Sequence, residues 1–312
     1  MKKRRELFFS SIVVIAILSL ISCYSTTKVS DQNIVDIYKN DLHSLHPEFR
    51  LVHVNDSLSQ VYYKINESEL LYERKALSDS FSASVRIFCR LTLNYESPLV
   101  MDSNSVVLNL QSTTNTRQEY TVGSIPIKIN KGNRYLLTIT AYDMNSKRTE
   151  TTYMDADKTD WMGSQNFLVH DQANGHLLFS LVFDTDMRIN IQYQHPAKKL
   201  YVRIYKNKFP IAAPPFSADE YNSPQLFADS SFSIHIKNGM FPLTLQSKGM
   251  YHIMVDSNDL GGLTLFRFDG GYPNISMAYE LAPPLRYISS NDEFEKFTRS
   301  TNPKQDVDIF LD

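Results

Sequence analysis

The fold is decided by the stretch SVRIFCRLTL, which runs from Ser84 to Leu93. Apolar and polar residues alternate along it, which places five apolar side chains on one face of an extended chain: Val85, Ile87, Cys89, Leu91 and Leu93. Such alternation predicts a β-strand with one buried face. Cys89 is therefore expected to be a small buried hydrophobic side chain, with a nucleophile or a metal ligand as the alternatives.

Comparable stretches lie on both sides of this strand. Strands are expected at 49–54, 59–65, 105–110, 118–129 and 134–142. The tripeptide Lys131-Gly132-Asn133 predicts a hairpin between the last two. Short strands separated by turn residues are typical of an immunoglobulin-like β-sandwich, although the cysteine and tryptophan signature of antibody domains is absent. We therefore predict a first β-sandwich over residues 46–155.

A second set of strands follows a polar stretch. Residues 144–160 lack a clear apolar period and are interpreted as a strand end plus a connection between domains. Further strands are expected at 165–170, 176–184, 187–194, 199–206, 231–236, 250–255 and 263–268. Four prolines in residues 209–228 predict an extended excursion. The prediction is an all-β protein of two consecutive immunoglobulin-like β-sandwich domains, the second over residues 160–280, with a short helical C-terminal segment.

The composition supports a folded, strand-rich chain. Of 312 residues, 42% are hydrophobic and 21% are charged, which excludes a disordered protein. The 32 Lys and Arg against 34 Asp and Glu give a net charge of −2, so we expect no nucleic-acid partner. Aromatic residues reach 12% while glycines number only 10, which favours strands over phosphate-binding loops.

The N-terminus has the layout of an export signal. Positive charges at residues 2–5 precede an apolar run at 12–20, which is short for a membrane span. The following Leu20-Ile21-Ser22-Cys23 resembles the bacterial lipobox. That resemblance implies a lipoprotein signal peptide at 1–22 and a fatty-acylated Cys23 that anchors the protein to a membrane. The alternatives are an ordinary secretory signal or an N-terminal anchor helix with an incidental cysteine.

The residues that follow the expected cleavage site indicate where in the cell the protein is located. A tether with a short helix is expected over 23–45. Tyr24, and not Asp, follows Cys23, so the inner-membrane retention signal of some bacteria is missing. An acidic cluster, which often marks surface-exposed Bacteroidetes lipoproteins, is also missing. We expect an outer-membrane anchor with the protein facing the periplasm.

Motifs for common catalytic sites do not occur. The chain has no phosphate-binding P-loop, no GxGxxG, no HExxH and no GxSxG, so we expect no cofactor, no metal and no catalytic residues. Weaker alternatives are a metal at His43 and His46, a calcium loop at Asp256–Gly261 that has Leu260 at a ligand position, and acid chemistry at Asp184 and Asp186. Asp171–Gly175 is expected to be a tight turn.

The last thirty or so residues change character. Residues 281–312 begin with an extended segment. Ser290 and Glu293 then match a capping box, which predicts that a helix begins there and ends at about Arg299. Phe294 and Phe297 are expected on the buried side of this helix. Asn302-Pro303 predicts the start of a second helix, whose apolar face is formed by Val307, Phe310 and Leu311. With Trp161, which either stacks on a ligand or fills a domain junction, these form the candidate interaction surface.

The stretch from Gly261 onward resembles a known family. The segments that carry the resemblance are GGLTLFRF at 261–268, Tyr272-Pro273, PLRYI at 284–288, Phe294-Glu295, Lys304 and VDIFLD at 307–312. They are similar to the GWxTD-domain lipoproteins of Bacteroidetes, and PLRYI is the most specific of them. The family implies an envelope-anchored double sandwich followed by a mainly helical module. The Gly-Trp-x-Thr-Asp motif does not occur in this chain, which is expected to be a natural truncation or half of a split member.

These observations lead to three functional hypotheses. The first is a lipid-anchored, non-catalytic interaction or scaffold module with an envelope protein partner. The second is a lipoprotein that binds glycans or peptides through aromatic residues of the second sandwich: Tyr193, Tyr201, Tyr205, Phe209 and Phe216. The third is an enzyme of unknown reaction. The sequence does not identify a ligand, and we expect the first hypothesis to hold.

Overall fold

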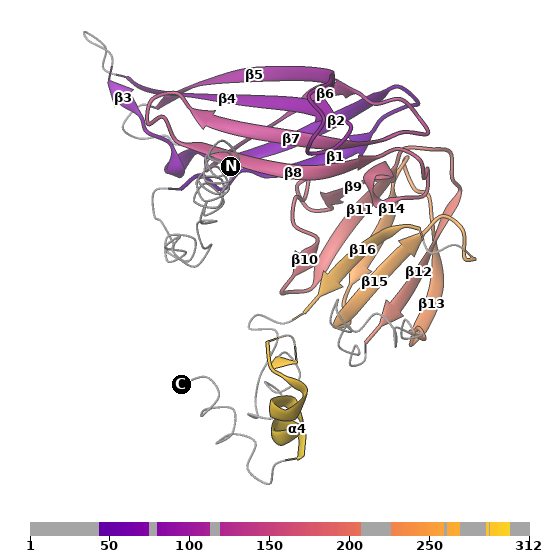
Figure 1. Cartoon of the computed structure of the whole chain (residues 1–312). Coiled ribbons are helices and arrows are strands. Elements are labelled where there is room, and N and C mark those ends of the chain that lie inside the picture. The colour runs from indigo at the N-terminus through magenta and orange to yellow at the C-terminus, as the bar shows by residue number, and fades with distance from the viewer. Residues whose placement is uncertain are drawn as a thin grey trace, which may run out of the picture. The chain divides into compact units, whose positions relative to one another are not determined.

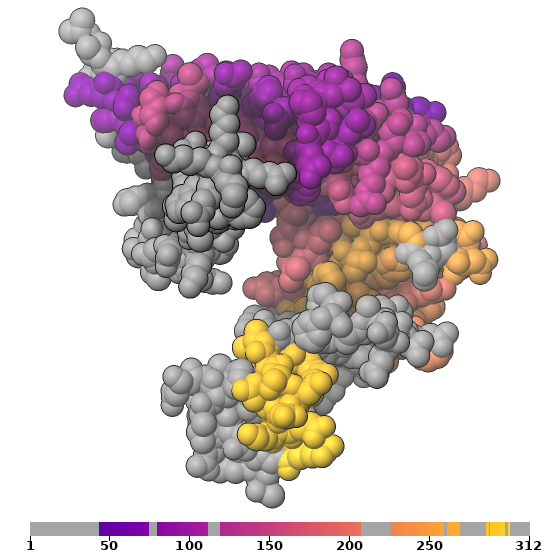
Figure 2. Space-filling view, viewed as in Figure 1, coloured from indigo at the N-terminus to yellow at the C-terminus, as the bar shows by residue number. Residues whose placement is uncertain are grey.

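Strands make up nearly all regular structure in the computed structural model of the chain (Figure 1). The structure describes residues 44–74, 80–112, 119–206, 226–258, 261–268, 285–286 and 288–299, which are the coloured residues of Figure 2. Within these ranges the α-helical structure is limited to α4, Asn291–Arg299, apart from short 3-10 turns. The all-β prediction is therefore confirmed.

Two antiparallel sheets enclose the first hydrophobic core. One sheet has the order β1-β2-β6, and in the other β4 pairs with β3, β5 and β7, and β7 pairs with β8. Their bounds are β1 Glu48–His53, β2 Leu58–Asn66, β3 Glu73–Arg74, β4 Phe81–Thr92, β5 Val100–Ser112, β6 Tyr120–Lys128, β7 Arg134–Asp143 and β8 Thr149–Asp157. Inward residues of both sheets form one buried cluster, which is the arrangement of a β-sandwich.

The central strand β4 has the alternation that its sequence predicts. Val85, Ile87 and Cys89 are fully buried, whereas Arg86 and Arg90 are exposed. Cys89 belongs to the core, and burial raises the pKa of its thiol to about 12. A thiol with so high a pKa is a poor nucleophile and a poor metal ligand, so the packing interpretation of Cys89 is confirmed.

Two predictions about the first sandwich are wrong. Residues 149–157, expected to be the end of a strand and a connection, form β8, which pairs with β7 along nine residues. β8 is an edge strand, and Ala156 is its only buried residue. Because so little of the strand is buried, its threonine-rich sequence shows no apolar period. The Lys131–Asn133 turn is not a hairpin, because β6 pairs with β2 and β7 pairs with β4, in different sheets.

Two further sheets enclose a second core. Their orders are β14-β11-β9 and β10-β16-β15-β12-β13, and every pairing is antiparallel except that of β10 with β16. The bounds are β9 Phe167–Asp171, β10 Val182–Phe183, β11 Met187–Tyr193, β12 Lys199–Tyr205, β13 Ser230–His235, β14 Phe241–Leu245, β15 Gly249–Met254 and β16 Leu263–Arg267. Fifteen buried side chains from both sheets form this core.

The strand expected at 176–184 is mostly absent. Only Val182 and Phe183 form a strand, while Leu177 makes an isolated bridge to His170 of the other sheet. The segment thus passes from one sheet to the other, with Leu178 and Leu181 packed against the core. This explains why apolar residues occupy both of its faces. The strand β14 was missed because Pro242 interrupts an otherwise alternating stretch.

The helix α4 begins as its sequence predicts. The Ser290 backbone N–H donates to Glu293 Oε2 at 2.9 Å, and the Glu293 N–H donates to Ser290 Oγ at 3.4 Å. These reciprocal bonds form the capping box. Several predictions lie outside the described residues: the signal peptide, Cys23, the helix at 31–40, most of the excursion at 209–228 and the second C-terminal helix with Val307, Phe310 and Leu311.

Candidate functional site

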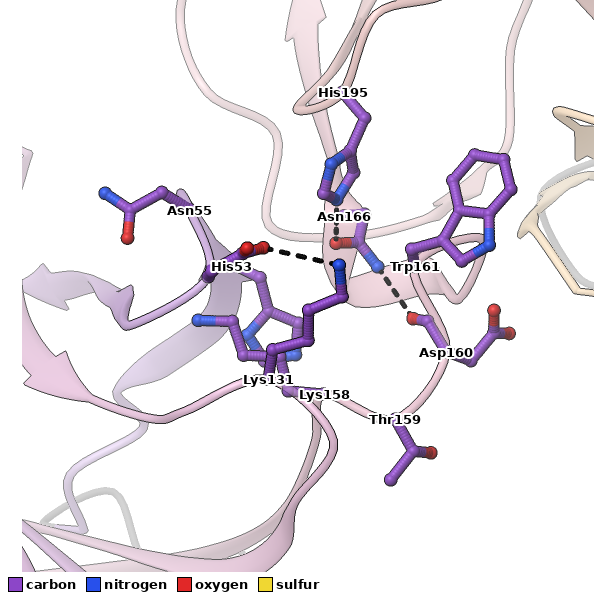
Figure 3. A pocket seen from close by; sticks show the side chains of 10 residues that line it. His53, Asn55, Lys131, Lys158, Thr159, Asp160, Trp161, Asn166 and His195 are labelled. Atoms are coloured by element: carbon purple, nitrogen blue, oxygen red, sulfur yellow. Dashed lines mark hydrogen bonds and ion pairs between the residues drawn. The ribbon is translucent and has the colours of Figure 1, made fainter.

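Trp161 lies on the connection between β8 and β9, and its side chain is 47% exposed (Figure 3). It lines a small cavity together with residues of both sandwiches, such as His53 and His195. The connection is held in place on both sides of the indole. Asp160 Oδ1 accepts from the Met162 N–H at 2.8 Å, and Asn166 Nδ2 donates to the Asp160 carbonyl at 3.1 Å. Trp161 is consequently presented from a fixed backbone.

Aromatic side chains of the second sandwich support this tryptophan. The His195 ring meets the indole edge to face at a centroid distance of 6.2 Å, and Tyr193 lies 5.5 Å from His195. The Tyr193 hydroxyl donates to the Trp161 carbonyl at 3.0 Å. Burial, and next the negative charge of Asp160, raise the pKa of Tyr193, so it stays a neutral donor. His195 and Tyr193 therefore lie beside Trp161, whose side chain remains about half exposed.

The cavity beside Trp161 is too small for a substrate. Its volume is about 30 Å³, and His53, Lys158, Asn166 and His195 contribute to its walls (Figure 3). A volume of this size holds about one water molecule. Asn166 Oδ1 lies 3.1 Å from His195 Nε2 at its edge. The site can therefore offer the surface of Trp161 to a partner but cannot enclose a small molecule.

A chain of hydrogen bonds lies beneath the cavity. Lys158 Nζ donates to Ser59 Oγ at 3.2 Å, and also to the carbonyls of Ile129 at 2.7 Å and Leu58 at 3.1 Å. Ser59 Oγ lies 2.9 Å from His53 Nδ1. His53 Nε2 lies 2.9 Å from the Asp157 carbonyl, which can only accept. Nε2 therefore carries a hydrogen, and in the neutral ring Nδ1 accepts from the Ser59 hydroxyl.

Burial affects the charge states of His53 and Lys158 in these hydrogen bonds. Desolvation lowers the pKa of His53 below its usual value, which agrees with the neutral ring. Desolvation also lowers the pKa of Lys158, to about 8, while the charge of Asp56 raises it, so the ammonium persists at neutral pH. A serine beside a histidine and a lysine has the composition of a nucleophilic site. However, Ser59 is fully buried and His53 is 2% exposed, so no substrate reaches them. The hydrogen bonds of His53, Ser59 and Lys158 join β1, β2 and the end of β8.

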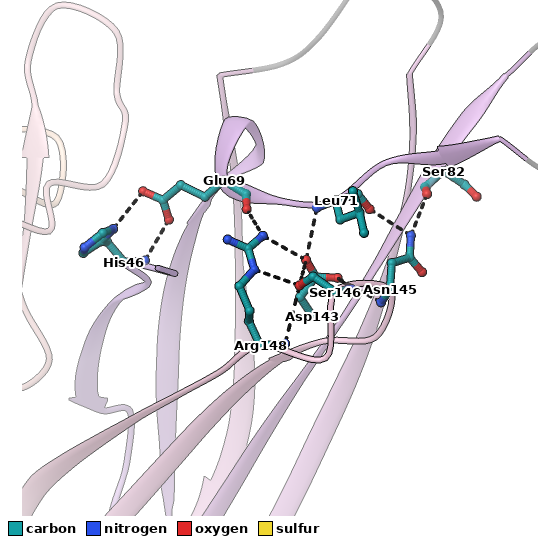
Figure 4. Close-up of polar contacts among 8 residues, drawn as sticks. All are labelled: His46, Glu69, Leu71, Ser82, Asp143, Asn145, Ser146 and Arg148. Carbon is teal, nitrogen blue, oxygen red and sulfur yellow. Dashed lines mark hydrogen bonds and ion pairs between the residues drawn. The ribbon is translucent and has the colours of Figure 1, made fainter. Parts of the chain in front are cut away.

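A second polar cluster closes the far end of the first sandwich (Figure 4). The side chain of Asp143 is fully buried and accepts from the Leu71 N–H at 3.1 Å and from Ser146 Oγ at 2.7 Å. Burial alone would raise its pKa, but these and other hydrogen bonds lower it overall. Arg148 donates to the Glu69 carbonyl and lies 3.4 Å from Asp143. Asp143 and Arg148 thus bond both within their own turn and to the segment of Glu69 and Leu71, so the cluster is structural.

The other candidate residues do not converge. Asp186 pairs with Arg267 at 2.8 Å, and Asp256 caps its own turn by accepting from the Asn258 N–H. His46 lies beside Glu69, and His43 is outside the described residues. In the described part of the chain no three His, Cys, Asp or Glu side chains gather as a metal site, and no helix is long and apolar enough to cross a membrane.

The structure describes three of the five aromatic residues that the sequence suggested for ligand binding in the second sandwich. Tyr193 is buried and Tyr201 and Tyr205 are half-buried, while Phe209 and Phe216 lie outside the described residues. Sequence reasoning missed the hydrogen-bonded chain of His53, Ser59 and Lys158. These residues are up to about a hundred positions apart, and each occurs in an unremarkable local context, so no pattern along the chain could have joined them.

Comparison with known proteins gives little likeness over the whole chain. No curated protein sequence matches it. Among solved structures it is similar to one titled "Biofilm associated protein - BSP domain", with 8% identity and a TM-score of 0.20. That match covers 77% of this chain and 55% of the other, so the chain spans about half the length of that protein. A likeness this low carries no inference about function.

The C-terminal part gives a more specific result. The family model described as "GWxTD domain" matches residues 249–312, which begin with β15 and include β16 and α4. This is the region where PLRYI and the segments around it resemble the family in sequence. The match supports a relation of the C-terminal fifth of this chain to the GWxTD family.

Proposed function

We propose that the protein is a lipid-anchored, non-catalytic interaction module of the bacterial cell envelope, of the type found among Bacteroidetes lipoproteins. The lipobox-like Leu20–Cys23 supports the anchor, and the GWxTD match supports an envelope role. The anchor would place the β-sandwiches at the periplasmic face of the outer membrane. Their task there is to bind a neighbouring envelope protein.

The observation that carries this proposal is the presentation of Trp161. Its indole is half-exposed on a connection whose backbone is fixed by Asp160 and Asn166. Large aromatic side chains dominate the binding energy of protein interfaces, and a fixed one loses little conformational entropy on binding. A rigid, exposed tryptophan beside a cavity that admits only water therefore suits a protein partner better than a small ligand.

The anchor is tested by labelling cells with a fatty-acid analogue. The chain has two cysteines, Cys23 and Cys89, which supply a matched pair of variants. Cys23→Ala is expected to lose the acyl label and to leave the membrane fraction. Cys89→Ala, which changes a buried core thiol, is expected to keep the label. Label retained by Cys23→Ala, with the product still in the membrane fraction, would contradict the anchor.

The interaction is tested with a photo-crosslinking residue at position 161. Crosslinking in intact cells is expected to give a discrete adduct with an envelope protein. The control places the same residue at Lys237, which is exposed on the turn between β13 and β14. No adduct from position 161, or equal adducts from both positions, would show that Trp161 is not the contact.

A further inference from the structure

The sheet of β5, β4, β7 and β8 presents a face that none of the interactions above uses. Because Val85, Ile87 and Cys89 of β4 point into the core, the alternate residues Arg86, Phe88 and Arg90 point outward. The registers align the outward residues of neighbouring strands with them. Arg86 lies beside Val107 and Tyr142, and Arg90 lies beside Ser103 and Thr138, which in turn neighbours Tyr153.

Positive charge dominates this outward face. Arg86 and Arg90 are both exposed, and their positions on one strand are separated by roughly 13 Å. Lys147 adds a third cation, with Nζ 5.9 Å from the ring of Tyr142. The outward acids of these four strands are Asp155 and Asp157, and Arg134 approaches them at 2.6 Å and 3.8 Å. Within these four strands three outward arginines, Arg86, Arg90 and Arg134, stand against two outward acids, so the face carries a small excess of positive charge.

Exposed aromatic rings lie on the same face. Tyr95 is 75% exposed and Tyr153 is 55% exposed, and their rings are tilted at a centroid distance of 5.5 Å. The Arg86 guanidinium lies 5.9 Å from the ring of Phe88. Threonine side chains of β7 and β8 lie on the same face, between the arginines of β4 and Tyr153 of β8. The hydroxyl groups of one pair, Thr140 and Thr151, are 3.4 Å apart. Stacking rings, hydroxyls and cations occur together on a flat surface.

We propose that this face binds an acidic polysaccharide. Carboxylate groups of such a chain would pair with Arg86 and Arg90, and sugar rings would stack on Tyr95 and Tyr153. The flat sheet suits an extended chain, because the two arginines are farther apart than a single sugar ring is wide. A nucleic acid would use the same cations and rings, and the test below distinguishes it from a polysaccharide. This face is distinct from the aromatic residues of the second sandwich.

The test measures binding of the full-length chain, in a nonionic detergent, to polygalacturonate. The fully methyl-esterified form of the same polysaccharide removes the charge and keeps the sugar backbone. We expect binding to the acidic form only, weakening as salt rises. Arg86→Gln/Arg90→Gln is expected to weaken it about tenfold, and Tyr153→Ala about fivefold. Both changes are on exposed side chains, and unchanged circular dichroism would confirm that the variants are folded.

A charge-matched control separates this face from general attraction. Arg188→Gln/Lys237→Gln removes two exposed positive charges from strands and a turn of the second sandwich and should leave binding unchanged. Equal weakening by both double variants, or equal binding of the methyl ester, would overturn the proposal. Absence of polygalacturonate binding would also overturn it, as would tighter binding of single-stranded DNA. None of these outcomes depends on the anchor or on Trp161, so the proposed function is tested separately.

Discussion

His53 is a buried histidine whose neutral form is required by its neighbours. Its Nε2 donates to the Asp157 carbonyl and its Nδ1 accepts from Ser59, whose oxygen also accepts from the Lys158 ammonium. Protonating His53 would turn the Nδ1 acceptor into a donor and place a second positive charge near Lys158. The first sandwich therefore depends on an uncharged ring.

The stability of the protein should fall in mild acid because of this residue. Burial lowers the pKa of His53 in the folded state, so the unfolded chain takes up a proton first as the pH falls below about 6.5. The stabilisation is complete above that pH and is lost as the pH falls toward the folded-state pKa. Urea unfolding at about pH 7.5 and about pH 5.5 should show the loss, and His53→Gln should reduce it. The control His235→Gln, at an exposed position, should retain the full pH dependence.

Single residues were predictable where the local pattern decides their environment. Cys89 could be placed in the core because it stands in a strict alternation. For Trp161 the sequence left two alternatives, because exposure on a connection depends on what packs against it. The burial of Ser59 and Lys158 was not predictable, since both are polar and their partners come from distant strands.

Elements were predictable where one face is buried and the other is exposed. Strand β4 satisfies that condition, and the capping box of α4 depends on residues only three positions apart. The edge strand β8 and the sheet-switching segment at 176–184 do not satisfy it. The first has too little buried area to impose a period, and the second packs apolar residues on both sides.

The start of β15 should tolerate no side chain. Gly249 has a φ of +138°, and an added Cβ would lie 2.3 Å from the backbone carbonyl oxygen of Tyr205. Gly249→Ala is expected to destabilise the fold by about 2–4 kcal/mol, because backbone strain and a clash with a paired strand add together. Chemical denaturation measures this loss.

A matched glycine separates strain from the clash. Gly175 also has a positive φ, +74°, but no atom lies within 4 Å of an added Cβ. Gly175→Ala should therefore cost only about 1 kcal/mol, the value for backbone strain alone. Equal losses for the two variants would show that close packing of Gly249 against β12 is not what requires a glycine there.

The first turn of α4 should depend on Ser290. Ser290→Ala removes the oxygen that accepts from the Glu293 N–H, which leaves helix donors without a partner. Hydrogen exchange at residues 291–299 is expected to accelerate roughly fivefold, with β15 and β16 unchanged. Ser290→Thr keeps an accepting hydroxyl and should exchange like the unchanged protein. Unaltered exchange in Ser290→Ala would show that the helix is held by other contacts.

The whole molecule consists of β-sandwich cores that carry their functional candidates on the outside. Both hydrophobic clusters are closed by their own sheets, and the buried ammonium of Lys158 donates to the strand carbonyl of Leu58 and to the carbonyl of Ile129. The two surfaces proposed here for function are the fixed indole of Trp161 and the cationic face of the first sandwich. The architecture followed from the sequence, whereas the location of these surfaces required the registers and exposures.

Whether the anchored protein works by binding a neighbour through Trp161 is decided by the mass of the particle extracted from its own membranes in mild detergent. We expect the particle to be heavier than a single processed chain in detergent, and Trp161→Ala to yield the lone chain while remaining in the membrane fraction. Recovery of the unaltered protein as a monomer, or of the same heavy particle from Trp161→Ala, would contradict it.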